Sequence, residues 1–160
     1  MKTSEFLDIT AAICPEKTAT TFEGKKETYE RLSERVSRLA QALSKLGVAR
    51  GDRVAILQVN CPQYIEAYFA TTKVGAIFVP LNFRAKGDEL SFMLKNSEAK
   101  ALFVGDRYVD LVGTLRPSLA GVSHFISIEG KAKGMLSYEA LLSSASPLEA
   151  AAEGSDDDIT

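Results

Sequence analysis

Short apolar runs alternate along this chain with segments of helical periodicity, and this alternation constrains the fold more than any other feature. The runs are rich in branched and aromatic residues, which indicates strands covered on both faces. They occupy residues 53–59, 76–79, 101–104 and 123–128. Strands that alternate with helices across short connections are typical of a layered structure. We therefore predict an α/β fold with a mostly parallel sheet and helices on its faces.

The clearest helix is predicted over residues 29–46, where apolar side chains recur at steps of three and four. This stripe consists of Leu32, Val36, Leu39, Leu43 and Leu46. Thr28 can cap the start of the helix with its hydroxyl, and Gly47 can end it in a left-handed conformation. The stripe should lie on the core. The opposite face carries Glu34, Arg35, Arg38, Gln41 and Lys45.

Further elements follow from the same kind of pattern. A helix should begin at Asn60 or Cys61 with Pro62 in its first turn, where a missing N–H costs nothing. Its predicted stripe is Tyr64, Ile65, Tyr68, Phe69 and Thr72. Two more helices are expected over 88–96 and 106–115, and a small hairpin over 18–28.

The chain is expected to form one domain over residues 1–160, since this length suits an ordinary single domain. After residue 128 the composition changes. Residues 130–134 are a flexible turn, residues 138–142 can form a short helix, and residues 143–158 are rich in small and acidic side chains. We interpret the stretch from about 129 to 160 as a surface connector.

Composition excludes several classes of protein. The formal net charge is −2 and no basic stripe is visible, which argues against a nucleic-acid partner. No apolar run reaches the ~20 residues that span a bilayer. The first residues lack the apolar segment of a secretory signal. The two cysteines, Cys14 and Cys61, form no Cys-x-x-Cys pair and are interpreted as free thiols in a reducing cytoplasm.

No residue of this chain stands out as catalytic, cofactor-binding or metal-binding. Neither common Gly-rich phosphate loop is present, and neither is a Gly-x-Ser-x-Gly elbow. The one histidine, His124, lies within a predicted strand and is interpreted as a packed or edge-exposed side chain. Three consecutive acids at 156–158 are interpreted as a solvated loop, because hard-cation loops need spaced ligands.

One strand-to-helix junction merits comparison with an anion site. Gly105-Asp106-Arg107 lies where a strand passes into a helix, a place that can bind anions on free N–H groups. The Asp106 carboxylate would itself occupy the positive N-terminal end of the helix, so helix capping is the favoured interpretation.

An ordered series of short motifs carries a resemblance to a known family. The series comprises Thr28-Tyr29-x-x-Leu32, Leu46-Gly47-Val48-x-x-Gly51-Asp52-Arg53-Val54-Ala55-Ile56, Asn60, Tyr64, Ala67-Tyr68-Phe69-Ala70, Lys73-Val74-Gly75-Ala76-x-x-Val79-Pro80-Leu81-Asn82, Glu89-Leu90, Leu94 and Leu102-Phe103-Val104. In this order it resembles the front of the adenylate-forming superfamily, which includes acyl-CoA synthetases, luciferases and peptide-synthetase adenylation domains. The likeness runs from about Thr20 to Thr160. The stretch 80–84 is similar to the acyl-CoA and aryl-CoA ligase branch, whereas Arg31 and 85–87 depart from the usual pattern.

The resemblance implies that the chain is the first part of the large amino-terminal domain of an AMP-forming acyl-CoA ligase. Such an enzyme joins a fatty or aromatic carboxylic acid to coenzyme A through an acyl-adenylate, with ATP and Mg²⁺. The family's phosphate loop, adenine-binding segment and mobile carboxy-terminal domain lie beyond residue 160. We therefore expect no activity and no bound cofactor in this chain alone, and we expect it to self-associate.

Two alternatives stay open at this point. The chain can be a truncated, non-catalytic paralogue that acts as an interaction module. It can also be an unrelated α/β domain that binds a small ligand. The residues that follow Thr160 in the gene distinguish these alternatives from the ligase.

Overall fold

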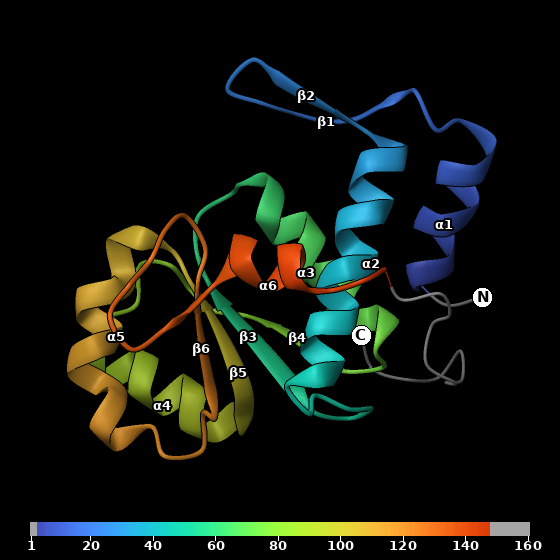
Figure 1. Cartoon of the computed structure of the whole chain (residues 1–160). Coiled ribbons are helices and arrows are strands. Elements are labelled where there is room, and N and C mark those ends of the chain that lie inside the picture. The colour runs from blue at the N-terminus through green and yellow to red at the C-terminus, as the bar shows by residue number, and fades with distance from the viewer. Residues whose placement is uncertain (1–2, 148–160) are drawn as a thin grey trace.

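The fold consists of a small hairpin, a five-stranded sheet and helices, and the computed structural model describes residues 3–147 (Figure 1). The helices are α1 (Thr3–Ile13), α2 (Tyr29–Lys45), α3 (Pro62–Lys73), α4 (Gly87–Ser97), α5 (Val109–Leu115) and α6 (Tyr138–Ser144), with the short 3₁₀ turns η1 (Asp106–Tyr108) and η2 (Arg116–Ser118). The strands are β1 (Thr18–Phe22), β2 (Lys25–Thr28), β3 (Arg53–Leu57), β4 (Ile77–Pro80), β5 (Ala99–Val104), β6 (His124–Ser127) and β7 (Leu136–Ser137).

The larger sheet has the order β4-β3-β5-β6-β7, and every neighbouring pair in it is parallel. The chain runs from β3 outward to β4 and then returns to the opposite side of β3 to form β5. Helices α3, α4 and α5 make the three crossovers between the first four of these strands in chain order. The α/β class and the parallel sheet predicted from the sequence are thus confirmed.

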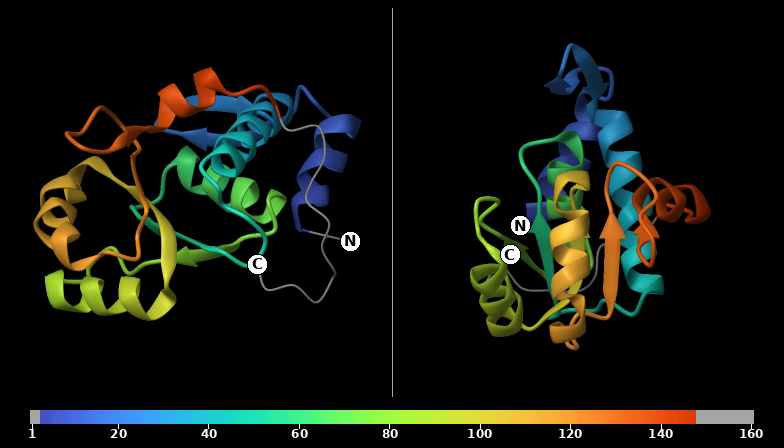
Figure 2. Two further views of the ribbon diagram at one scale, coloured as in Figure 1. Left: turned by 60° about the horizontal axis from the view of Figure 1, so that its bottom comes forward. Right: turned by 90° about the vertical axis from the view of Figure 1, so that its left-hand side faces the viewer.

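Helices cover both faces of this sheet, as the two views in Figure 2 show. The cluster of buried side chains on one face joins the strands to α2, α3 and α6. The cluster on the other face joins them to α4, α5 and η1. Successive residues of β3 alternate between the clusters, with Val54 and Ile56 in the first and Ala55 and Leu57 in the second. This explains why the strand carries an unbroken apolar run.

Helix α2 forms as its sequence predicts. The Thr28 hydroxyl accepts the Arg31 N–H at 3.3 Å, which caps the start of the helix. Gly47 has a φ of 82°, a left-handed conformation that stops the helix. The predicted stripe is buried except for Leu46, which packs partly buried at its edge. The core-facing side of α2 is confirmed.

The predicted stripe of α3 is wrong in part. The helix begins at Pro62 with Cys61 at the N-cap, as expected, but its buried residues are Glu66, Ala67, Ala70, Thr71, Thr72 and Lys73. Ile65 is exposed, and the aromatic side chains of the predicted stripe are only partly buried. Alanines bring α3 close to α2 and the sheet, so the large side chains lie at the margin of the contact rather than in its centre.

The hairpin of β1 and β2 is confirmed. Its turn residues Glu23 and Gly24 have φ values of 48° and 79°, and two consecutive positive values are typical of a two-residue hairpin turn that matches strand twist.

Two parts of the fold were not predicted from the sequence. Helix α1 packs on α2 and α3 and is absent from the sequence-based prediction. Within the stretch interpreted as a surface connector, β7 joins the sheet beside β6, and α6 follows with Tyr138 fully buried. Residues 136–144 therefore belong to the packed domain. The rest of that stretch, from residue 148, lies outside the described residues.

Candidate functional site

The first candidate site is the crevice at the carboxyl ends of β3 and β5. Open α/β sheets bind ligands where the strand order reverses, and here the reversal falls between these two strands. Gln58 follows β3 and is almost fully buried, and Gly105 follows β5. A Cβ on Gly105 would lie 2.5 Å from the Gln58 amide oxygen. Glycine at this position therefore lets the Gln58 side chain fill the crevice.

A carboxylate of the protein completes the filling of this crevice. Glu129, just beyond β6, accepts the Asp106 N–H at 2.7 Å with one oxygen and a hydrogen bond from the Gln58 amide with the other. The Gln58 carbonyl oxygen in turn accepts the Val59 N–H at 2.8 Å. The prediction that Asp106 caps the following helix is wrong, because Gly105 is the N-cap and makes no side-chain bond. The anion that binds the free N–H at the start of η1 is the Glu129 carboxylate, which lies just beyond the end of β6.

The second candidate site is a network of charges around Arg35, between α2, α3 and α6. The Arg35 Nε donates to Glu66 Oε1 at 2.8 Å, and its two terminal nitrogens donate to Glu139 at 3.1 and 2.7 Å. The Tyr138 hydroxyl donates to the other Glu66 oxygen at 2.6 Å. Glu27 on β2 lies 3.9 Å from Arg35. The Arg35 side chain is thus largely buried between ion pairs, and α2 carries this buried charge at the edge of its leucine stripe, one residue before the buried Val36.

Burial and pairing change the acid–base properties of this network. Burial alone would lower the pKa of Arg35, but its hydrogen bonds to Glu139 and Glu66 outweigh burial and raise that pKa. Burial raises the pKa of Tyr138 well above its usual value, and the neighbouring Glu66 adds to the effect. Burial also raises the pKa of Glu27, with Glu66 as the second cause. The arginine and the phenol therefore keep their protons at neutral pH, and the network holds three helices together rather than exchanging protons.

A cavity of about 490 Å³ lies beside this network, under the hairpin. Its walls come from the hairpin, α2, α3 and α6, with Glu27, Arg31, Gln63 and Glu139 among the polar side chains that face it. A second cavity of about 300 Å³ shares the hairpin residues and reaches Cys61 and Tyr64. Burial raises the pKa of the Cys61 thiol, so this sulfur is held protonated and is a poor nucleophile.

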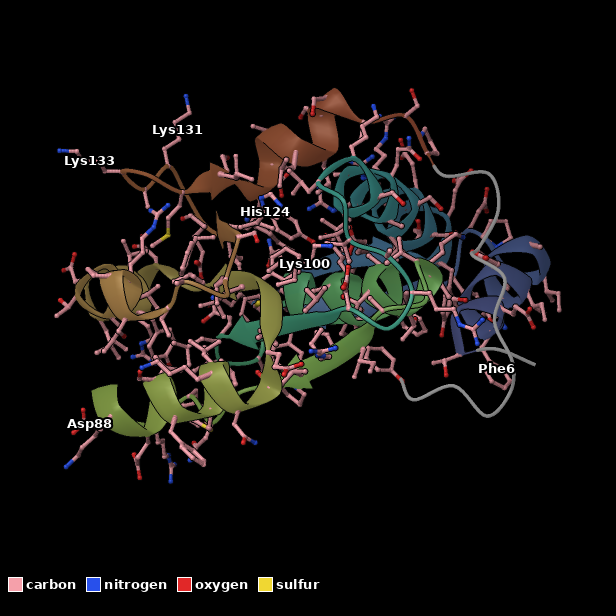
Figure 3. All side chains as sticks on the ribbon, turned by 90° about the horizontal axis from the view of Figure 1, so that it is seen from below. Phe6, Asp88, Lys100, His124, Lys131 and Lys133 are labelled. Carbon is pink, nitrogen blue, oxygen red and sulfur yellow. The ribbon has the colours of Figure 1, made fainter. Side chains whose placement is uncertain are left out.

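The remaining residues singled out from the sequence have structural roles or fall outside the structure. The His124 Nε2 lies 2.9 Å from the Leu46 carbonyl oxygen, which joins the start of β6 to the end of α2 (Figure 3). Cys14 and Cys61 are both free. The acids at 156–158 lie outside the described residues. Within residues 3–147 no three potential metal-ligating side chains gather, and no helix there is long and apolar enough to cross a membrane.

The family model for AMP-binding enzymes matches residues 7–159. The chain belongs to the AMP-binding enzyme family. Among curated relatives within this family, indoleacetate–CoA ligase from Aromatoleum aromaticum is 38% identical over 142 residues, which are 89% of this chain and 28% of that protein. The chain spans less than a third of the length of the curated relatives it matches.

Solved structures share the fold described above. An anthranilate CoA ligase, AuaEII, crystallised with anthranoyl-AMP, superposes with a TM-score of 0.94 at 24% identity, over 99% of this chain and 31% of that one. A fatty acyl CoA synthetase of Mycobacterium tuberculosis gives 0.89 at 28% identity, over 98% of this chain and 31% of that one. Both likenesses include the hairpin and the five-stranded sheet, since they cover nearly all of this chain.

Several of the sequence motifs that carry the family resemblance have structural roles in this fold. Gly47 ends a helix, Gly51 and Gly75 adopt positive φ in tight turns, and Pro80 ends the edge strand β4. The buried network around Arg35 and Glu66 was missed in the sequence. A weak signal for it exists, because Glu66 stands beside the small residues that mark the buried face of α3.

Proposed function

We propose that this chain forms the front part of an ATP-dependent, AMP-forming acyl-CoA ligase. The match of residues 7–159 to the AMP-binding family carries the proposal, and the 38% identity to an indoleacetate–CoA ligase supports the acid–thiol branch. In the proposed reaction a carboxylic acid and ATP give an acyl-adenylate and pyrophosphate. Coenzyme A then takes the acyl group and releases AMP. The proposed acid is a fatty or aromatic one, in line with the names of the relatives.

The residues described here fit a scaffold role within that enzyme better than a catalytic one. Gln58 and Glu129 fill the crevice where an open α/β sheet would hold a nucleotide, and no phosphate loop occurs in the sequence. We therefore assign ATP, Mg²⁺ and coenzyme A to other parts of the enzyme and assign no catalytic or cofactor-binding residue to this chain. The chain alone should be inactive.

The proposal also covers the setting of this chain. We place the enzyme in the cytoplasm without a nucleic-acid partner, which agrees with a net charge of −2 and no basic stripe. The isolated chain should self-associate, burying well over ~1,000 Å² in total. Among the described strands β4 ends the sheet, but Ile77 and Leu81 donate their N–H groups toward β3, so only Phe78 offers an outward N–H and Pro80 limits pairing at this edge. Support comes instead from exposed apolar side chains, Ile65 and Phe83 among them. Sedimentation equilibrium at micromolar concentration tests this, and a clean monomer would contradict it.

A chimaera tests the ligase proposal. In it, this chain replaces the 142 matched residues of the Aromatoleum indoleacetate–CoA ligase. Exchange of labelled pyrophosphate into ATP, dependent on indoleacetate, should exceed background in the chimaera. It should stay at background for this chain alone and for the ligase that lacks the matched segment. A folded but inactive chimaera would argue against the ligase and for an interaction module, and exchange by the chain alone would show that it carries its own active site.

A further inference from the structure

Helix α1 has a buried side and an exposed side that is apolar. Ser4 and Leu7 lie on the buried side, where the helix packs on α2 and α3. On the other side, Phe6, Ile9 and Ile13 are 53, 47 and 78% exposed. These three residues form the outer face of α1. Their spacing of three and four residues places them on a single stripe, the arrangement by which one helix packs against another element.

Contacts to two other helices fix the orientation of α1, so the exposure of its outer face does not come from free rotation of the helix. The Lys73 Nζ on α3 donates to both Asp8 oxygens at 2.9 and 2.8 Å, and the Lys73 side chain is almost fully buried. The Ser33 hydroxyl on α2 donates to Asp8 at 3.4 Å. These contacts hold α1 from two neighbouring helices, and its rotation about its own axis would break them.

We infer that the outer face of α1 is the surface on which apolar side chains from the remaining two thirds of the same ligase dock. This inference rests on the proposed function. Its first support is the length of the relatives, which extend over more than three times the segment matched here. The anthranilate CoA ligase AuaEII contains nearly this whole fold, which makes up 31% of its chain.

The second support is the small size of the outer face. The three exposed side chains span ~10 Å of helix axis. Two copies of this face would bury on the order of 600 Å² in total, whereas a stable complex of separate proteins needs at least ~1,000 Å². A second copy of the chain, or any unlinked protein, is therefore held too weakly by this face alone. A segment of the same polypeptide docks at a millimolar effective concentration and needs no such area.

Thiol labelling in two contexts tests this inference. I9C is introduced into the chain with Cys14 and Cys61 replaced by serine, and into the same chain within the chimaera. Phe92 on α4, which is 67% exposed, provides the matched control F92C. Figure 3 shows Phe6 on α1 at the opposite end of the molecule from Asp88 in the first turn of α4, so the two probes report on different surfaces.

The labelling rate of I9C should fall at least about tenfold from the isolated chain to the chimaera, because a covered thiol reacts only after local opening. F92C should label at a similar rate in both. The isolated chain is measured at a concentration where sedimentation velocity shows a monomer. If I9C lowers the thermal midpoint of the isolated chain, F6C reports on the same face.

Each other outcome would overturn the inference. Equal I9C rates in both contexts would show an open outer face, and slowing of both probes would show a general loss of access. Protection of I9C only when the isolated chain dimerises would assign the face to a second copy. Pyrophosphate exchange by the same chimaera separates the two proposals: an active chimaera with unprotected I9C contradicts the docking surface alone, whereas an inactive one contradicts the ligase as well.

Discussion

The buried carboxylate of Glu66 should matter far more to stability than an exposed carboxylate that binds the same arginine. Glu66 accepts with both oxygens, one from Arg35 and one from Tyr138, and its side chain is 2% exposed. Glutamine keeps one acceptor oxygen and places an NH₂ group against the second donor. The E66Q variant thus leaves a buried donor without an acceptor and removes the charge that compensates Arg35.

The magnitude follows from these losses. Removing one partner of a buried ion pair costs about 3–5 kcal/mol, but Arg35 keeps its two bonds to Glu139, so the lower part of that range applies. An unsatisfied buried phenol adds about 1–3 kcal/mol. We therefore expect E66Q to lower the free energy of unfolding by about 4–6 kcal/mol.

E139Q is the matched control, because Glu139 also accepts from Arg35 with both oxygens but its side chain is 56% exposed. Water replaces the lost bonds there, so the cost should stay within about 1 kcal/mol. Urea unfolding followed by far-UV circular dichroism at neutral pH measures both variants. Equal losses, or a loss of under about 1 kcal/mol for E66Q, would show that burial of the network does not determine its strength.

Three further predictions concern other parts of the structure. L39A removes a fully buried side chain from the stripe of α2 and should lower the free energy of unfolding by about 2–5 kcal/mol. E34A on the opposite face should change it by no more than about 0.5 kcal/mol. Urea melts that show equal losses would contradict the orientation of the helix. G105A forces a methyl group into Gln58 and should cost about 1–3 kcal/mol. The G105A/Q58A double variant should lose less unfolding free energy than the sum of the losses of the two single variants. Full additivity would rule out the contact between the added methyl group and the Gln58 side chain. Glu27 has a raised pKa, so the folded chain binds the proton of this carboxyl more readily than the unfolded chain does. The stability that this group contributes is present below the ordinary pKa of 4.5. It is lost as the pH rises through the pKa of the folded state. E27Q should therefore raise the urea midpoint at neutral pH, and this gain should shrink as the pH falls toward 4.5; a gain independent of pH would refute the assignment.

Local patterns in the sequence predicted the elements whose formation depends on neighbouring residues. The leucine stripe, the Thr28 cap and the stop at Gly47 are interactions within a few residues, and α2 follows them within one residue of its predicted end. The apolar strands and their parallel order also follow, because a strand covered on both faces needs helices between it and the next one. Helix α1 was missed because Phe6, Ile9 and Ile13 form its exposed side while Ser4 lies on its buried side.

The candidate sites depend on residues that are far apart in the chain. Arg35 binds partners 31 and 104 residues away, and Glu129 accepts a hydrogen bond from the Asp106 N–H, 23 residues before it. A helix pattern alone places Arg35 on the polar face of α2 and assigns it to solvent. The burial of the Arg35 side chain is decided by its partners on α3 and α6.

By itself, then, the sequence determined the class of fold, most of its elements and the family, because periodicity, caps and turns are local and the family's motifs are made of them. Only the tertiary structure decided which charges are buried, that Glu129 and Gln58 close the crevice between β3 and β5, and that α1 presents an apolar outer face. The physical reason is that each of these depends on where a distant element packs. Burial and electrostatic pairing are properties of the assembled layers and are not encoded in any short stretch of the chain.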